Sequence, residues 1–181
     1  MTQYAVVGDP IAHSKSPQIH RLFAEQTGED VQYEKHRVKA DEFSGFVEDF
    51  FAAGGGGLNV TLPHKEAAFS LAQKKSEQTE LAKAANTLWL NEKGELQAEN
   101  TDGTGLINDL CNNHAVNLEN KNILMLGAGG AARGALAALI TTRPSGITVL
   151  NRTLARAETL KKDFASVFNL TIGDYNSGLS E

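Results

Sequence analysis

A glycine-rich segment in the second half of the chain has residue types and spacing that suit a bound dinucleotide. The segment consists of Gly127, Ala128, Gly129, Gly130, Ala131 and Ala132, and an apolar stretch over residues 122–126 precedes it. In such a pattern the first glycine makes a tight turn and the second lets the backbone approach a pyrophosphate. The helix predicted over residues 131–140 then points unpaired N–H groups at the phosphates. A plain strand-to-helix turn is the alternative, and the flanking strand and helix favour the nucleotide site over it.

The end of the next predicted strand indicates which dinucleotide binds. Folds that bind NAD usually place an acidic residue there for the ribose hydroxyls, and this chain has none. It has instead Asn151, Arg152, Thr153 and, one helical turn later, Arg156. Guanidinium groups form paired hydrogen bonds with phosphate, so the pattern predicts NADP(H). The alternative is that the arginines are solvent-exposed residues at a helix start and bind no ligand, although cations there oppose the helix dipole.

Short polar residues in the first part of the chain suit hydrogen bonding to a polyhydroxylated ligand. They are Ser14, Ser16, Asn59, Thr61, Asn86 and Asp102. Helix caps and turns explain them nearly as well when each is taken singly. Lys65 differs, because it follows Pro63 at a predicted helix start, where a cation opposes the dipole and needs a compensating purpose.

Alternating strand and helix patterns over the first hundred residues predict a layered α/β domain that positions these groups. The expected strands cover residues 4–7, 31–38, 58–61, 86–91 and 96–98. Ser16 is expected to cap a helix that ends at Gly28, and Asp41 to cap a second helix. A single longer helix is expected over residues 65–85. We place a substrate-binding and catalytic domain at residues 1–101.

The remaining residues, 102–181, are expected to form part of a dinucleotide-binding domain. A helix follows Asn100 and gives way to an aperiodic polar stretch over residues 112–121, which is the candidate linker. Strands are predicted over 122–126 and 147–150, with helices over 131–140 and from Leu154 towards Phe168. Thr153 is expected to cap the last helix. The order of strand, glycine turn, helix, strand and helix is that of the first half of a Rossmann-like fold.

Composition limits the class of protein. A hydrophobic fraction of 41% and a charged fraction of 22% are ordinary for a globular chain, so it should fold. The net charge is −5 and the 17 basic residues are scattered, so no nucleic-acid partner is expected. The single Cys111 cannot form an internal disulfide, and neither a signal peptide nor a membrane-spanning run is present. We therefore expect a cytoplasmic protein that is not inserted in a membrane. No metal site is expected.

The motifs together resemble the shikimate dehydrogenase family over essentially the whole chain. GDPIAHSKSP at residues 8–17 is similar to that family's substrate loop, and NVTLPHK at residues 59–65 to its lysine segment. NT at residues 86–87 and NTDG at residues 100–103 resemble further substrate contacts. The glycine segment and residues 151–153 resemble the family's cofactor segments.

The resemblance implies the reversible reduction of 3-dehydroshikimate to shikimate by NADPH, a step on the shikimate pathway to chorismate and the aromatic amino acids. It implies Lys65 and Asp102 as the catalytic pair, which transfers the proton while hydride moves to or from the nicotinamide. Ser14, Ser16, Thr61 and Asn86 would hold the substrate carboxylate and hydroxyls together with that pair. Glu77 would approach the cofactor.

Family members are expected to continue with further strands and with helices that return to the first domain, so the nucleotide domain here is expected to be partial and the activity of the chain stays open. Two alternatives remain. One is a quinate/shikimate dehydrogenase paralogue, and the other is a non-catalytic nucleotide-binding fragment. The oligomeric state also stays open, a homodimer being one option.

Overall fold

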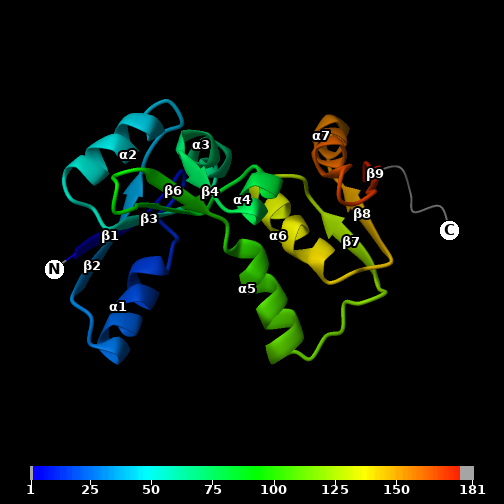
Figure 1. Ribbon diagram of the computed structural model, residues 1–181, viewed down its shortest axis with the longest axis horizontal. Coiled ribbons are helices and arrows are strands. Elements are labelled where there is room, and N and C mark those ends of the chain that lie inside the picture. Colours follow the sequence, from blue (N-terminus) through cyan, green and yellow to red (C-terminus); the bar gives the residue numbers. More distant parts are fainter. Residues whose placement is uncertain (1, 176–181) are drawn as a thin grey trace. The chain divides into compact units, whose positions relative to one another are not determined.

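A computed structural model describes residues 2–175 of the chain, and contacts divide these residues into two units with the division after Asn100. Each unit has its own sheet (Figure 1). The first unit contains β1 (Thr2–Gly8), α1 (Ser16–Thr27), β2 (Val31–Arg37), α2 (Phe43–Ala52), β3 (Gly57–Val60), α3 (Lys65–Leu71), β4 (Lys74–Lys75), α4 (Glu77–Ala82), β5 (Thr87–Leu90) and β6 (Leu96–Glu99). The second contains α5 (Asp102–Asn108), the π-helical turn η1 (Asp109–Asn113), β7 (Asn122–Leu126), α6 (Gly130–Thr141), β8 (Gly146–Leu150), α7 (Leu154–Phe164) and β9 (Thr171–Gly173). This alternation confirms the predicted α/β class.

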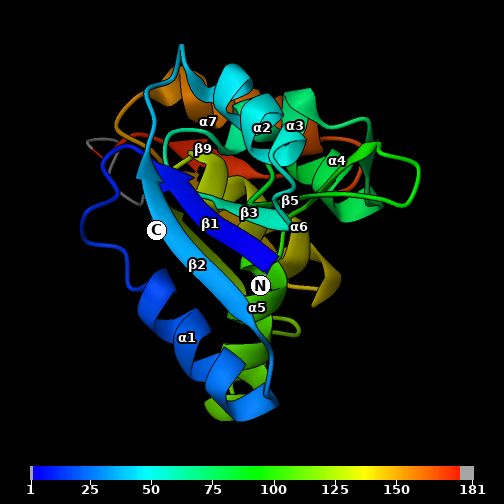
Figure 2. The same ribbon diagram turned by 90° about the vertical axis from the view of Figure 1, so that its left-hand side faces the viewer.

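The sheet of the first unit is mixed, with strand order β2-β1-β3-β5-β6-β4. β1 runs parallel to both β2 and β3, whereas β5 runs antiparallel to β3 and β6. Helix α2 places four buried apolar residues, Phe43, Val47, Phe50 and Phe51, in the core together with side chains of the sheet. Within this unit α2 and α3 cover one face of the sheet, and α1 lies on the opposite face (Figure 2). The sheet therefore has its main core on the α2 side.

The second unit has three parallel strands in the order β7-β8-β9, joined through α6 and α7. It forms the predicted first half of a Rossmann-like fold. Helix α5 packs against α6 at two glycines, because a Cβ atom added to Gly103 would collide with the carbonyl oxygen of Gly134. The same Cβ would lie 2.6 Å from the Cβ of Ala138. Glycine at this position thus sets how closely the two helices approach.

The single helix expected over residues 65–85 is wrong, because the chain leaves the helix at Ala72, which is extended. The backbone N–H of Gln73 donates to the carbonyl of Leu96, and the Gln73 side chain accepts from the Leu96 N–H. Residues 74–75 then pair with β6, and Ser76 caps a second helix by accepting from Thr79 N. Pairing with a distant strand outweighs the local preference for helix.

The helix caps predicted at Ser16 and Asp41 and the predicted linker are also wrong. Ser16 is the first residue of α1 and makes no cap; Ser14 Oγ instead accepts from the Ser16 N–H at 3.3 Å. Asp41 is not a cap, because α2 begins at Phe43 and its N-cap residue is Glu42, which makes no side-chain cap. Thr153 occupies the N-cap position of α7 as predicted, but its side chain makes no cap hydrogen bond. The polar stretch at 112–121 lies inside the second unit, because the chain divides after Asn100.

A buried polar network holds α4 and the end of β6 together. Glu99 Oε1 accepts from Ser76 Oγ at 2.7 Å, from Thr79 Oγ1 at 2.9 Å and from the Asn100 N–H at 3.0 Å. The Asn100 side chain, which is 1% exposed, donates to the carbonyl of Ala84. Burial works to raise the pKa of Glu99, but the three hydrogen bonds to its carboxylate outweigh burial and leave the pKa below its usual value.

Replacing Gly103 with alanine should destabilise the second unit by about 1 to 3 kcal/mol, because α5 and α6 must separate to admit the methyl group. Gly105→Ala is the matched control: it lies on the same helix and its added Cβ meets nothing within 4 Å. That control should leave stability equal or raise it by up to about 1 kcal/mol, since alanine is the better helix former. Urea denaturation of both variants makes the comparison, and equal stabilities for the two would contradict the packing described.

Glu99 should make stability depend on pH in the acidic range. Its pKa is lower in the folded chain than in the unfolded chain, so its contribution is present above the ordinary glutamate pKa of about 4.3 and is lost as pH falls through the folded value. Urea denaturation between neutral pH and pH about 3 should show a flatter profile for Glu99→Gln than for the parent. Glu92→Gln, in an exposed turn, should keep the parent's profile. Identical profiles for all three proteins would refute the role of Glu99.

Candidate active site

One edge of the first sheet gathers the ends of three strands. The parallel strands β1 and β3 end there, and the antiparallel β5 begins there, with Val7 opposite Val60. Backbone hydrogen bonds fasten the segments that leave the strands: Thr61 N donates to Val7 O at 2.9 Å, and Val60 N to Asn86 O at 2.7 Å. Thr61 and Asn86, both predicted to bind substrate and both half-buried, are thereby brought to the same edge.

Ser14 and Ser16 lie in the loop between β1 and α1, which leaves this edge. The Asp9 N–H donates to Leu62 O at 2.9 Å, so the start of the loop is tied to the segment after β3. The two serine hydroxyls lie 3.2 Å apart and hydrogen-bond to each other, and both residues are half-buried. A pair of adjacent hydroxyl donors suits the two oxygens of a carboxylate.

Lys65 is the first residue of α3 and is half-buried at the same edge. Its carbonyl accepts from the Ala85 N–H at 2.8 Å, which places its backbone beside the residue that precedes Asn86. His64, 1% exposed, fixes the backbone just before it: the His64 ring stacks on Phe43 at 4.5 Å, and its Nε2 lies 2.8 Å from Val38 O. The lysine therefore projects from a rigid support.

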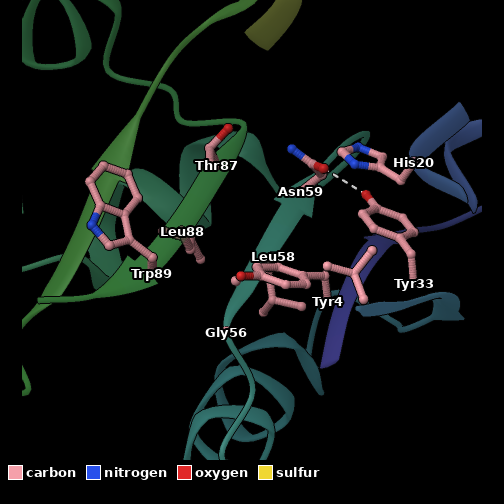
Figure 3. A pocket seen from close by; sticks show the side chains of 11 residues that line it. Tyr4, His20, Tyr33, Gly56, Leu58, Asn59, Thr87, Leu88 and Trp89 are labelled. Carbon is pink, nitrogen blue, oxygen red and sulfur yellow. Dashed lines mark hydrogen bonds between the residues drawn. The ribbon is translucent and has the colours of Figure 1, made fainter. Parts of the chain in front are cut away.

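Tyr33 and Asn59 join this group, and sequence reasoning found only the second. The Tyr33 hydroxyl donates to Asn59 Oδ1 at 2.6 Å, as Figure 3 shows, and Ser16 also hydrogen-bonds to Tyr33. Burial raises the pKa of Tyr33, against the opposing effect of the Ser16 hydrogen bond. A tyrosine in a half-buried strand is ordinary, so no sequence signal distinguished it.

A cavity of about 360 Å³ opens over the neighbouring part of the sheet, lined mainly by apolar and aromatic side chains such as Tyr4, Leu88 and Trp89 (Figure 3). Of the short polar residues predicted to suit a polyhydroxylated ligand, only Asn59 lines it; Ser14, Ser16, Thr61, Lys65 and Asn86 do not. Its lining surface is mostly apolar, which suits a carboxylate and several hydroxyls poorly. The polar edge, and not this cavity, is therefore the candidate substrate site of the first unit.

Two predicted residues belong to a different unit from the groups they were expected to join. Asp102, half-buried, is the first residue of α5 and belongs to the second unit, so its pairing with Lys65 stays a prediction. Glu77, exposed, is the first residue of α4 in the first unit, whereas the other predicted cofactor residues belong to the second. Its approach to the cofactor likewise stays a prediction.

The glycine segment of the second unit has the geometry that a bound pyrophosphate requires. Gly127 has φ +112°, a value that side-chain-bearing residues rarely adopt, and its N–H donates to Leu150 O at 2.8 Å. Gly129 is the N-cap of α6 and Gly130 its first residue. Added Cβ atoms at Gly127 and Gly129 would meet no protein atom within 4 Å, so the space above the turn is open to a ligand. Ala128 and Ala131 complete the turn at the helix start.

Asn151 links this turn to the predicted phosphate-binding arginines. Its Oδ1 accepts from the Ala128 N–H at 3.2 Å and its Nδ2 donates to Thr153 O at 2.8 Å. Arg152 and Arg156 are exposed, and neither guanidinium has a protein partner within residues 2–175. Two unpaired cations at the positive end of the α7 dipole are unfavourable unless an anion binds there.

Other kinds of site are not found in the described part of the chain. No group of three or more His, Cys, Asp or Glu side chains between residues 2 and 175 could hold a metal ion. Among the helices in that range, none has both the length and the apolar character needed to span a bilayer.

Two family models match most of the chain. The first, described as the shikimate dehydrogenase substrate binding domain, matches residues 6–88, and the second, described as shikimate / quinate 5-dehydrogenase, matches residues 109–181. The chain is 52% identical over 161 residues to the shikimate dehydrogenase (NADP(+)) of Marinobacter nauticus, covering 89% of this chain and 58% of that protein. It is 48% identical over 177 residues to the protein of that name from Thioalkalivibrio sulfidiphilus, covering 98% and 65%.

A solved structure agrees with the sequence relatives. Shikimate 5-dehydrogenase from Thermus thermophilus, in complex with NADP(H) and shikimate, is 34% identical with a TM-score of 0.84, over 96% of this chain and 63% of that one. The chain thus spans roughly three fifths of the length of the relatives it matches. The two family models, the sequence relatives and the fold together show that the chain belongs to the shikimate dehydrogenase family.

Proposed function

We propose that the protein containing these residues oxidises shikimate to 3-dehydroshikimate reversibly with NADP(H). The observation that carries the proposal is the polar edge of the first sheet, where Ser14, Ser16, Thr61, Lys65 and Asn86 extend from adjoining segments. The names of the relatives and the ligands in the Thermus thermophilus structure support the same substrate and cofactor. A cytoplasmic location and a homodimer stay predictions from the sequence.

The polar edge suits a ring that carries one carboxylate and several hydroxyls. Ser14 and Ser16 donate to the carboxylate, and Thr61 and Asn86 bind ring hydroxyls. Oxidation of the secondary alcohol removes a hydride and a hydroxyl proton together, and NADP⁺, when bound, would supply the hydride acceptor. The Lys65 amine receives the hydroxyl proton and returns it in the opposite direction, while Asp102 orients the amine and the hydroxyl.

The second unit fits the nucleotide in three respects. The open turn at Gly127 and Gly129 admits the pyrophosphate at the α6 N-terminus. Arg152 and Arg156 provide exposed cations for the 2′-phosphate, with Thr153 as a further donor. The side-chain amide of Asn151 hydrogen-bonds to the glycine turn at Ala128 and to Thr153, and so holds these two segments together. Glu77 is assigned to the cofactor by resemblance alone.

Quinate is the second candidate substrate, because the family model that matches residues 109–181 is described by both acids. A panel of shikimate and quinate, each with NADP⁺ and NAD⁺, separates the two. Faster NADPH formation with quinate than with shikimate would favour the second candidate.

Replacing Arg152 with alanine should weaken NADPH binding by roughly 10- to 150-fold, the equivalent of about 1.5 to 3 kcal/mol for a charged hydrogen bond. NADH binding should change little, since NADH lacks the 2′-phosphate. Fluorescence titration with both nucleotides gives the two affinities. Lys162→Ala, an exposed cation in the last turn of α7, is the control and should alter neither. Equal weakening for NADH and NADPH would rule out recognition of the 2′-phosphate by Arg152.

Replacing Lys65 with alanine should lower kcat for shikimate oxidation by roughly 10²- to 10⁴-fold with a modest change in KM, because a proton-transfer group is lost. NADPH absorbance follows the reaction. The control is Lys93→Ala, in the exposed turn between β5 and β6, which should keep the parent's kcat and KM. A Lys65→Ala enzyme with the parent's kcat would remove Lys65 from the mechanism.

A further inference from the structure

Four side chains of the first unit form a hydrogen-bonded row that starts at the two serines. Ser14 Oγ bonds to Ser16 Oγ at 3.2 Å, Ser16 bonds to the Tyr33 side chain, and the Tyr33 hydroxyl donates to Asn59 Oδ1 at 2.6 Å. The row crosses from the loop before α1, over β2, to β3. Figure 3 shows its last bond, with the Tyr33 and Asn59 side chains directed at one another.

In the chain without a ligand, the Asn59 end sets the order of donors and acceptors in the row. An amide oxygen can only accept, so the phenol of Tyr33 donates its single proton to Asn59. The Tyr33 oxygen is then left with acceptor capacity alone and receives the proton of Ser16. The direction of the Ser16 hydroxyl is therefore set by a residue 17 positions along the chain.

Tyr33 also holds the helix on which Ser16 stands. The His20 ring, one helical turn after Ser16, stacks on the Tyr33 ring at 4.0 Å with 7° between the planes. Among the described residues of α1 none is fully buried, so a hydrophobic core does not fix the position of this helix. A ring stack and a hydrogen bond, both made to Tyr33, anchor its first two turns to β2.

Tyr33 can act in the row as a neutral hydroxyl that both donates and accepts. The ordinary phenol pKa of about 10 already keeps the proton on Tyr33 at neutral pH, and burial raises that pKa further. When a carboxylate arrives, the Ser16 proton can turn towards it, and the phenol can then turn its own proton from Asn59 to the Ser16 oxygen. Hydrogen bonds in such a chain polarise one another, which strengthens the donor that faces the anion.

We propose that Tyr33 is a positioning residue for a carboxylate subsite formed by Ser14 and Ser16, acting through Ser16 and through the first turns of α1. The inference rests on the proposed function, because that function supplies the carboxylate. It adds the residue that aims the serine pair.

The test compares shikimate affinity across four variants of the chain by isothermal titration calorimetry. Tyr33→Phe keeps the ring that stacks on His20 and removes only the hydroxyl; it should weaken shikimate binding roughly 3- to 10-fold. Tyr4→Phe is the matched control, since Tyr4 pairs with Tyr33 across β1 and β2 and lines the neighbouring cavity. It should bind shikimate like the parent. Ser16→Ala should also weaken binding, and adding Tyr33→Phe to it should cost less than a further twofold.

The methyl ester of shikimate separates positioning from a merely structural role. Because the ester carries no charge, the Tyr33→Phe change should affect its binding less than twofold, whereas a distorted site would weaken acid and ester alike. Parent-like affinity of Tyr33→Phe for the acid, full additivity with Ser16→Ala, or equal losses for acid and ester would each overturn the inference while leaving the proposed function standing. Parent-like affinity of Ser16→Ala would overturn the serine subsite of the proposed function, and the role of Tyr33 with it.

Discussion

The pairing of β5 with β3 is the constraint on which the first unit depends. It brings a segment from residue 85 onwards against the segment that follows β3, and two backbone bonds close the join, Val60 N to Asn86 O and Ala85 N to Lys65 O. Because β5 runs antiparallel, its start lies where β1 and β3 end, so polar residues from three separate segments reach a single edge. The apolar packing of α2 on the sheet keeps that edge rigid without contributing any group to it.

In the second unit, a glycine turn and one side-chain amide position the candidate cofactor residues. A positive φ at Gly127 turns the chain sharply between β7 and α6, and Asn151 ties that turn to the residues after β8. A single amide thus links the turn proposed to bind a pyrophosphate to the residues proposed to bind a 2′-phosphate. Arg133 of α6 and Asp163 of α7 form an ion pair at 2.8 Å that joins the two helices, and both side chains are largely buried.

Local patterns allowed the sequence to predict most strands and the glycine turn, because apolar runs and glycine spacing carry that information directly. Residues 122–126 were predicted as a strand with the bounds that the structure has for β7. The helix over residues 65–85 was wrong because the Gln73 bonds to Leu96 are made across 23 positions and leave no local pattern. The strand β9 was missed for a similar reason. It is short, and it is defined by its pairing with β8 and not by a local pattern.

The residues of the candidate site divide in the same way, into those that the sequence can indicate and those that only contacts in the fold reveal. Ser14, Ser16, Thr61, Lys65 and Asn86 could be selected by residue type, by helix position and by resemblance, whereas Tyr33 could not, because its importance comes from what its hydroxyl touches. The expected cap at Ser16 failed for an instructive reason. The hydroxyl expected to bond the helix N-terminus is directed along the row to Tyr33, and Ser14 receives the Ser16 N–H instead.

The central claim is that the polar edge of the first sheet binds the substrate with its carboxylate on the serine pair and its reacting hydroxyl on Lys65. A crystal structure of the protein with shikimate and NADP⁺ tests it most directly. The account predicts the carboxylate within hydrogen-bonding distance of both serine hydroxyls, and the Lys65 Nζ within hydrogen-bonding distance of the hydroxyl that faces the nicotinamide. Shikimate bound in the cavity beside Tyr4 and Trp89, or a Lys65 amine directed away from the ring, would contradict it.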